Sequence, residues 1–224
     1  MRTIIIANGT PPTAADLDRW LKPGDRLICA DGGGRAALAA GLKPDLVIGD
    51  FDSLSEVELA ALTASGAALE RHPRQKDATD LELALRRALV DGATDIVVLG
   101  GLGGRLDHTL ANAMLLALPG LSGGRARMAG GAETLFVIRS GETLALNGQT
   151  GDTVSLLPLG EAAGIVTSGL AYPLRNEALR VGPARGVSNE MYSTRATIRL
   201  GTGFLLCIHI RREAGQDSPP ISSK

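Results

Sequence analysis

The sequence lacks the cysteine pattern of disulfide-bonded and zinc-binding proteins, and it lacks the excess of positive charge that is typical of nucleic-acid-binding proteins. Its 224 residues include two cysteines, Cys29 and Cys207, each inside an apolar run and in no metal-binding spacing. This pattern excludes a disulfide scaffold, and we expect both thiols to be reduced core groups of a cytoplasmic protein. The formal net charge of −1 gives no general attraction to nucleic acid or to an anionic membrane.

Long apolar runs are also missing. The first residues, MRTIIIANGT, contain an apolar run that is too short for a secretion signal, and no stretch is long enough to span a bilayer. The hydrophobic content of 44% and the charged content of 21% are those of an ordinary globular protein. A chain of this length can form one large domain or two modest ones.

The pattern of apolar residues changes near residue 130. Before it, β-branched runs such as TIIIAN, RLICAD, DLVIGD and DIVVLGG alternate with Ala- and Leu-rich segments of helical period. The alternation predicts an α/β domain over residues 1–130, with a mainly parallel sheet between layers of helices. After it, short strand candidates separated by Gly, Pro and Asn predict an all-β module, either a sandwich or a barrel, over residues 131–211. Residues 212–224 are polar and are expected to form a frayed tail.

Polar residues follow three of the predicted strands. Asp31 comes after LICA, Asp50 and Asp52 follow LVIG in the stretch VIGDFDSLS, and GGLGGRLDH follows IVVLG. Because the carboxyl ends of parallel strands share one edge, where ligands bind, we expect these groups to line one crevice. A single Asp at such a place is typically a turn former or a helix cap. Three strand ends with such groups favour a site.

The acidic residues at this edge predict a metal ion. Asp50 and Asp52 would be joined by Asp77 and Asp80 from KDATDLE. Clustered carboxylates repel one another unless a cation holds them or they share protons. No Cys or His lies beside them, so the cation that fits is Mg²⁺ rather than Zn²⁺.

The segment TDLE has a second interpretation as a helix start. It is typical of a capping box, in which Thr79 caps the helix and the Glu82 side chain reaches back to it. In that case Asp80 suits the positive end of the helix. The cap leaves Asp80 facing the crevice.

The stretch GGLGGRLDHTLAN, residues 100–112, supplies a complementary anion site. Its glycines let the backbone approach a ligand and turn N–H groups toward it, and the helix that follows adds positive potential. Arg105 can grip phosphate oxygens with its fork of donors. The stretch matches neither a Walker A loop nor G-x-G-x-x-G, and a glycine run alone can be a tight turn. Opposite a carboxylate cluster it indicates a nucleotide and phosphoryl-type transfer.

In this order and at these separations, ADGGG, GDFDS, KDATDLE and GGLGGRLDHTLAN resemble the thiamine pyrophosphokinase family. The resemblance covers roughly residues 1 to 211. It implies a Rossmann-like α/β catalytic domain followed by a β-sandwich thiamine-binding domain. It also implies transfer of the β,γ-diphosphate of ATP to the hydroxyl of thiamine with Mg²⁺, and a homodimer whose sites are shared between subunits.

The resemblance assigns roles to residues in the matching motifs. Asp50, Asp52 and Asp80 would form the catalytic metal and diphosphate cluster, with Asp31 lining the same crevice. Independently of the resemblance, we take Asp80 as the candidate proton acceptor for the thiamine hydroxyl. The residues that would position the reactants are Ser53, Lys76, Asp77 and Thr79. The nucleotide-phosphate segment would comprise Gly103, Gly104, Arg105, Asp107, His108 and Asn112.

In the second domain, TSGLAYPL and GVSNE resemble the thiamine-binding strands. Tyr172 stands where the family often has a tryptophan that stacks on the thiamine ring, and Tyr offers a smaller face. Ser188 and Asn189 would hydrogen-bond thiamine. The alternative for Tyr172 is a core aromatic of a small sandwich.

Two other functions remain compatible with the residues. A Mg²⁺-dependent nucleotide phosphohydrolase would release AMP or ADP without thiamine, but it gives the β domain no task. A non-catalytic nucleotide-binding module would bind ATP without turnover, and the dense carboxylate cluster argues against it.

Overall fold

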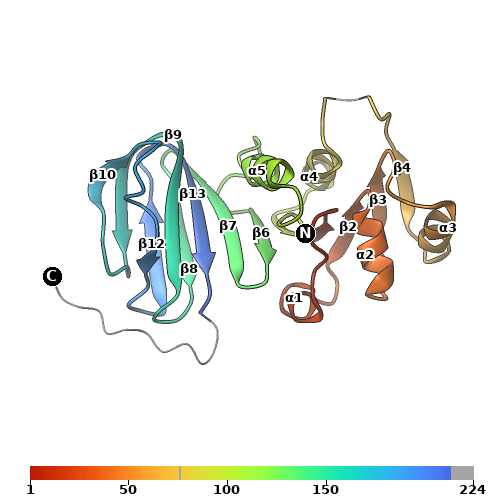
Figure 1. Ribbon diagram of the computed structural model, residues 1–224, viewed down its shortest axis with the longest axis horizontal. Coiled ribbons are helices and arrows are strands. Elements are labelled where there is room, and N and C mark those ends of the chain that lie inside the picture. Colours follow the sequence, from red (N-terminus) through yellow and green to blue (C-terminus); the bar gives the residue numbers. More distant parts are fainter. Residues whose placement is uncertain (76, 213–224) are drawn as a thin grey trace. The chain divides into compact units, whose positions relative to one another are not determined.

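The structure is a computed structural model that describes residues 1–75 and 77–212, so Lys76 and nearly all of the predicted tail lie outside the described residues. The chain forms two compact units. Among the described residues, unit 1 comprises residues 1–75, 77–121 and 125–131, and unit 2 comprises residues 122–124 and 132–212. In Figure 1 the helices belong to the red-to-green part of the chain, whereas the teal-to-blue part consists of strands.

Unit 1 alternates strands and helices. In chain order they are β1 (Arg2–Ile6), α1 (Ala14–Trp20), β2 (Arg26–Ala30), α2 (Gly33–Ala39), β3 (Leu46–Gly49), α3 (Glu56–Ala64), β4 (Ala68–Arg71), α4 (Asp80–Val90), β5 (Asp95–Leu99), α5 (Leu106–Leu115) and β6 (Ala126–Gly130). The strands lie in the order β4-β3-β2-β1-β5-β6, and every pair is parallel. The predicted α/β fold with a parallel sheet is confirmed.

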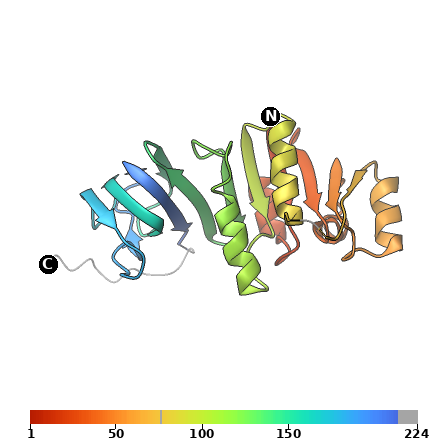
Figure 2. The same cartoon turned by 90° about the horizontal axis from the view of Figure 1, so that it is seen from above.

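The strand order determines where a ligand can bind. The chain steps outward from β1 through β2 and β3 to β4, then returns to β5 beside β1 and continues to β6. Right-handed crossovers therefore place α1, α2 and α3 on one face and α4 and α5 on the other. Helix α4, yellow in Figure 2, packs on β1, β2 and β3. The direction of winding reverses between β1 and β5, and ligands of such sheets bind at the carboxyl ends of the strands there.

The two cysteines are free thiols in the interiors of the two units. Cys29 and Cys207 are both fully buried. Burial disfavours the thiolate and raises the pKa of each thiol to about 12. Both side chains are packing residues, as predicted.

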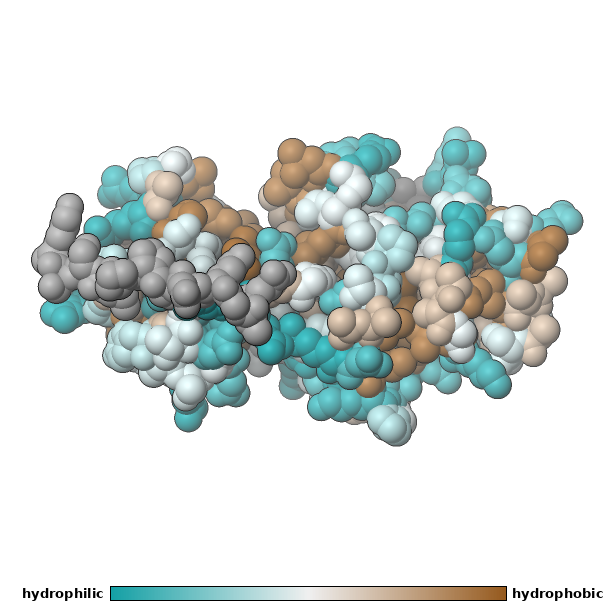
Figure 3. All heavy atoms as spheres, turned by 60° about the horizontal axis from the view of Figure 1, so that its bottom comes forward, coloured by the Kyte–Doolittle hydropathy of each residue, from teal (hydrophilic) through white to brown (hydrophobic). Residues whose placement is uncertain are grey.

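The surface of the described part of the chain is mixed in polarity. Among residues 1–75 and 77–212, no helix has the length and apolar character needed to cross a membrane. Figure 3 shows hydrophilic residues spread over the face that it draws, with hydrophobic residues between them.

Unit 2 is built from strands alone among its described elements. They are β7 (Glu133–Arg139), β8 (Thr143–Asn147), β9 (Thr153–Ser168), β10 (Arg175–Leu179), β11 (Asn189–Glu190), β12 (Arg195–Arg199) and β13 (Thr202–Ile210). The long strand β9 pairs with β13 along its first part and with β12 and β10 along its second, always antiparallel. Apolar side chains from these strands enclose one core. The predicted β-rich C-terminal domain is confirmed.

A buried hydrogen bond between two side chains joins the end of β13 to the turn before β9. His209 Nε2 lies 2.8 Å from Asp152 Oδ2, and neither side chain is more than 6% exposed. The Asp152 carboxylate also accepts hydrogen bonds from the backbone N–H groups of Gln149 and Arg212, at 3.1 and 2.9 Å. Burial by itself raises the pKa of Asp152, but the hydrogen bonds from Arg212, Gln149 and His209 outweigh burial and lower the pKa below 3.8.

We therefore expect the stabilisation from Asp152 to be pH-dependent. Because its pKa is lower in the folded chain than the reference value of 3.8, the stabilisation is complete above that pH and lost as the pH falls through the folded pKa. Asp152→Asn should cost about 2 kcal/mol of unfolding free energy at pH 7, since it removes hydrogen bonds to a buried charge. Urea unfolding at pH 7, 5 and 3 measures the free energy of unfolding of both proteins. The difference in this free energy between wild type and variant should shrink below pH 4. An equal difference at all three values would contradict this account.

Candidate active site

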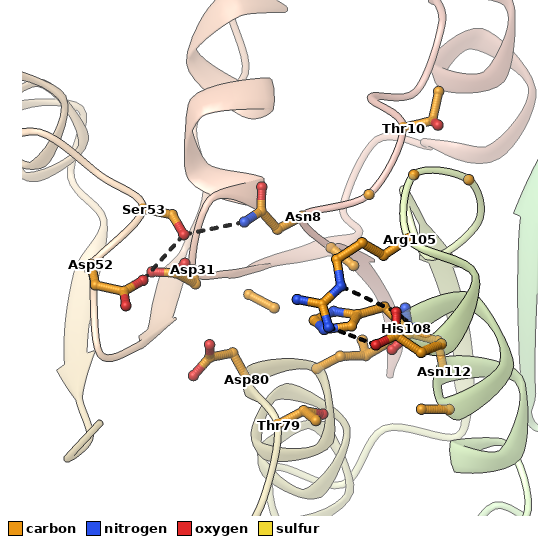
Figure 4. Close-up of a pocket in the computed structure, with 18 of the residues that line it drawn as sticks. Asn8, Thr10, Asp31, Asp52, Ser53, Thr79, Asp80, Arg105, His108 and Asn112 are labelled. Atoms are coloured by element: carbon orange, nitrogen blue, oxygen red, sulfur yellow. Dashed lines mark hydrogen bonds and ion pairs between the residues drawn. The ribbon is translucent and has the colours of Figure 1, made fainter. Parts of the chain in front are cut away.

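A cleft with a volume of about 1080 Å³ lies at the point where the winding of unit 1 reverses. It is lined by the loops that follow β1, β2, β3 and β5 and by the starts of α4 and α5. Figure 4 shows Asp31 and Asp52 on one side, Arg105, His108 and Asn112 on the other, and Asp80 with Thr79 between the two groups. The sequence predicts this edge of the sheet as the ligand site, and the structure brings polar groups from four strand ends together there.

Three carboxylates form the acidic side of the cleft. Asp31 follows β2, and Asp50 and Asp52 follow β3, so the neighbouring parallel strands deliver all three to one place. One carboxylate oxygen from each lies within 4.8 Å of the others. The Asp52 N–H donates to Asp50 Oδ1 at 3.0 Å, which links the two acidic residues directly. Arg74 partly balances the charge through an ion pair of 3.2 Å with Asp52.

Asp31 is the member of this cluster that is least accessible to water. It is 4% exposed, and its Oδ1 has no hydrogen-bond partner among the described residues. Its backbone is left-handed, with φ of 43°, a conformation that costs energy for a residue other than glycine. A buried acceptor without a partner is unfavourable unless a ligand satisfies it. The sequence predicts Asp31 as a lining residue, whereas the structure places it within the cluster.

Asp80 enters the cleft as the first residue of α4. Its carboxylate lies against Gly49, where an added Cβ would meet the Asp80 Cγ at 3.2 Å. The Thr79 side chain caps the helix by accepting a hydrogen bond of 3.2 Å from the Glu82 N–H. The second half of the predicted capping box is wrong, because the Glu82 carboxylate binds Arg86 one turn further along, at 2.7 Å. Thr79 alone is the side-chain cap.

The glycine-rich loop after β5 forms backbone hydrogen bonds with the loop after β1. The N–H groups of Gly9 and Thr10 donate to the carbonyls of Gly100 and Leu102, at 2.7 and 3.0 Å. Gly103 has φ of 79°, and a Cβ there would lie 2.1 Å from the Thr10 hydroxyl. Only glycine fits both the backbone conformation and this close approach. These contacts hold the loop against the loop after β1 as part of the cleft wall.

Arg105 and the start of α5 form the basic side of the cleft. The Arg105 guanidinium makes two hydrogen bonds with the Asp107 carboxylate, at 3.1 and 2.6 Å. These bonds lower the pKa of Asp107 to about 2. Asp107 also accepts the His108 N–H at 2.9 Å, and Asn112 Nδ2 donates to the Gly101 carbonyl at 2.9 Å. The Arg105 guanidinium is therefore paired with the neighbouring Asp107 carboxylate at the cleft wall.

Some lining residues are missing from the sequence prediction. Asn8 and Thr10 follow β1 and line the cleft, and Asn8 Nδ2 donates to Ser53 Oγ at 3.3 Å (Figure 4). The signal was available, because NGT follows the apolar run TIIIA at the same strand edge as the three aspartates. Asp77 is exposed and does not line the cleft, and Lys76 lies outside the described residues.

Unit 2 has a smaller pocket of about 590 Å³ beside Tyr172, whose side chain is 66% exposed. The Asn189 amide brackets the backbone of Tyr172: Oδ1 accepts its N–H at 3.0 Å, and Nδ2 donates to its carbonyl at 2.7 Å. Ser188 is left-handed, with φ of 58°, and its N–H donates to Ser155 Oγ at 3.0 Å. Tyr172 and Asn189 line the pocket, whereas Ser188 does not.

Comparison with known families and proteins gives the following matches. The protein-family model described as "Thiamin pyrophosphokinase, catalytic domain" matches residues 17–122. The family model described as "Thiamin pyrophosphokinase, vitamin B1 binding domain" matches residues 142–205. The chain is 31% identical over 210 residues to a thiamine pyrophosphokinase of Bacillus subtilis, which covers 93% of this chain and 98% of that protein. A thiamin pyrophosphokinase of Caenorhabditis elegans is 26% identical over 75% of this chain and 70% of its own length.

Solved structures match over most of the chain. The crystal structure of Bacillus subtilis thiamine pyrophosphokinase superposes with a TM-score of 0.81 and 27% identity, over 95% of this chain and 100% of that one. A thiamin pyrophosphokinase family protein from Enterococcus faecalis gives the same TM-score of 0.81 at 25% identity, with the same coverage.

Proposed function

Since this chain belongs to the thiamine pyrophosphokinase family, we propose that the cleft of unit 1 is where it transfers the β,γ-diphosphate of ATP to the hydroxyl of thiamine, giving thiamine diphosphate and AMP. The observation that supports this placement best is the composition of the cleft. Three carboxylates face a glycine-rich loop and Arg105 across one cavity. Transfer of a diphosphate needs charge neutralisation and positioning more than covalent help, and this arrangement supplies both.

The carboxylate side fits Mg²⁺. Its donors are all oxygens, and the buried Oδ1 of Asp31 has no partner among the described residues. Asp31, Asp50 and Asp52 would hold the ion, with Asp80 beside them at Gly49. When bound, Mg²⁺ neutralises negative charge on the phosphates.

The opposite side of the cleft would hold the phosphates of ATP. Gly103 and Gly104 let the loop approach them closely, and the N-terminus of α5 contributes positive potential. Arg105 would release Asp107 and donate hydrogen bonds to phosphate oxygens instead. Its planar guanidinium can donate two such bonds at once. His108 lines the same wall. Asp80 is the candidate proton acceptor for the thiamine hydroxyl, because its carboxylate lies in the cleft beside the acidic cluster.

The thiamine ring would be held by unit 2. Tyr172 is exposed beside a pocket, and an exposed aromatic ring can stack on a planar heterocycle. Asn189 would contribute by fixing the Tyr172 backbone, since both polar atoms of its amide bind there. Ser188 remains a predicted thiamine contact.

We infer that the working unit is a homodimer in which unit 1 of one subunit and unit 2 of the other form each site. An exposed apolar stripe on α5 supports this assembly. Leu106, Leu110 and Met114 follow one another at four-residue spacing and are 72%, 53% and 58% exposed. Such a stripe beside a polar cleft is typical of a surface that a protein partner covers. We place the enzyme in the cytoplasm, where ATP is present and where its two unpaired cysteines stay reduced.

The nucleotide product tests this function. After incubation with ATP, Mg²⁺ and thiamine, ³¹P NMR should show AMP and thiamine diphosphate as the new species. ADP together with thiamine monophosphate would contradict transfer of the diphosphate in one step.

A pair of glycine variants tests the phosphate loop. Gly103→Ala should raise the KM for ATP by about tenfold or more, because it adds both a left-handed alanine and a clash with Thr10. Gly104→Ala is the matched control, since φ is 71° but nothing lies within 4 Å of the added Cβ. It should have the smaller effect. Steady-state kinetics with varied ATP measures both, and equal KM values for the two variants would argue against the clash.

A further inference from the structure

The segment from Asp50 to Ser53, here called the carboxylate loop, has an unfavourable backbone. Phe51, between the two acidic residues, has φ of 66°, although a bulky residue rarely adopts left-handed conformations. Its ring is only 5% exposed and belongs to the core under the helices α1, α2 and α3. Such a conformation persists only where surrounding contacts impose it. The contacts that do so determine where Asp50 and Asp52 point.

Arg71 makes two of these contacts from the edge strand β4. Its Nη1 donates to the Asp50 carbonyl at 3.0 Å, and its guanidinium stacks on the Phe51 ring at 4.7 Å from the centroid. Residue 71 is the register partner of Gly49 in the β3–β4 pair, and the His72 N–H donates to the Gly49 carbonyl at 2.8 Å. The edge strand β4 and the residue after it therefore contact the start of the carboxylate loop and Gly49, the residue before it.

Arg35 holds the other end of the loop from α2. Its Nη2 donates to the Ser53 carbonyl, and its Nε lies 2.5 Å from Glu58 Oε1. Glu58 in turn accepts the Ser55 N–H at 2.7 Å in the capping box of α3. Arg35 is thus fixed in place by the helix that follows the loop.

We propose that Arg71 and Arg35 are positioning residues for the metal site: they donate to the carbonyls of Asp50 and Ser53 and so keep the Asp50 and Asp52 carboxylates beside Asp31. Neither arginine is among the residues that line the cleft. The proposal rests on the proposed function only in assigning a divalent cation to the cluster. Lysine cannot replace either residue, because it lacks the planar guanidinium. In Arg71 this group donates to a carbonyl and stacks on Phe51, and in Arg35 it donates to a carbonyl and pairs with Glu58.

Stability is expected to depend little on these two side chains. Arg71 is exposed. In the ion pair of Arg35 with Glu58, the Arg35 side chain is 56% exposed. Exposed ion pairs contribute little to folding. A role in positioning therefore predicts a change in cation affinity without a matching loss of stability.

The test measures cation binding by the full-length chain without nucleotide. Mn²⁺ serves as the probe, and EPR of the free ion gives its Kd for wild type, Arg71→Lys and Arg35→Lys. Arg71→Lys should raise the Kd by about tenfold, because it removes both the carbonyl contact and the stack that hold the left-handed Phe51. Arg35→Lys should raise it in the same direction. Excess Mg²⁺ should restore much of the turnover of both variants, which a collapsed site would not allow.

The matched control is Arg87→Lys. Arg87 also reaches β4, through its ion pair with Glu70, but it touches no part of the carboxylate loop. Its variant should bind Mn²⁺ like wild type. The melting temperature in chelator should be the same, within error, for all three variants.

The outcomes separate this proposal from the function on which it rests. No Mn²⁺ binding by wild type would refute the metal site itself and, with it, the positioning role. Mn²⁺ binding by wild type with an unchanged Kd in Arg71→Lys would refute the positioning role alone. A melting temperature of Arg71→Lys well below that of Arg87→Lys would also overturn it, because the side chain would then serve the fold.

Discussion

Asp52→Asn and Asp80→Asn should each lower turnover at least ~100-fold, the loss expected when a group that stabilises transition-state charge is removed. Asparagine keeps the shape of aspartate but not its charge, and Asp52 and Asp80 both line the cleft. A 100-fold loss corresponds to about 2.7 kcal/mol of transition-state stabilisation. Steady-state kinetics at saturating ATP and Mg²⁺ measures it.

Folding should be unaffected or improved in the same variants. The clustered carboxylates repel one another, since oxygens of Asp31, Asp50 and Asp52 lie within 4.8 Å. Removal of one charge therefore leaves the apo melting temperature equal to or above that of wild type. Asp18→Asn, at an exposed position of α1 away from the cleft, is the control and should keep full turnover. Wild-type turnover in both site variants would mean that these aspartates are only caps and turn formers.

The second large effect is recovery of activity when two inactive proteins are mixed. Asp80→Ala damages the cleft of unit 1, and the double change of Tyr172 and Ser188 to Ala damages the proposed thiamine side. If each site uses unit 1 of one chain and unit 2 of the other, a heterodimer has one intact site. Random reassociation of equal amounts makes about half of the dimers heterodimers, so roughly a quarter of wild-type activity should return.

A control distinguishes sharing from other causes of recovery. Asp80→Ala mixed with Asp52→Asn damages unit 1 in both chains, so no heterodimer has an intact site and the mixture should stay inactive. Subunit exchange is followed independently with differently tagged chains. No recovery in the first mixture despite complete exchange would show that each site lies within one chain.

The sequence predicts the acidic side of the cleft because simple geometry determines it. Asp31 and Asp50 each follow a continuous apolar run, and adjacent parallel strands bring their ends together. The α/β and β-rich parts follow from periodicity for the same reason. Asn8 was missed although it stands at the same edge, because NGT resembles an ordinary turn when no strand order is known.

Other features depend on contacts that periodicity cannot show. The pairing of Arg71 with Gly49 requires the register of β3 and β4, and the bracket of Asn189 around Tyr172 joins residues 17 apart. Glu82 was expected in a capping box, but Arg86 one turn later is the stronger partner for its carboxylate. Where a side chain has two possible partners, local sequence does not decide between them.

The most direct measurement of the central claim is the dependence of AMP formation on thiamine. The purified chain is incubated with ATP and Mg²⁺, with and without thiamine, and AMP and thiamine diphosphate are quantified by chromatography. Diphosphate transfer predicts that the two products form in equal amounts and that almost no AMP forms without thiamine. AMP release at the same rate in the absence of thiamine would contradict the account and would identify the chain as a nucleotide hydrolase.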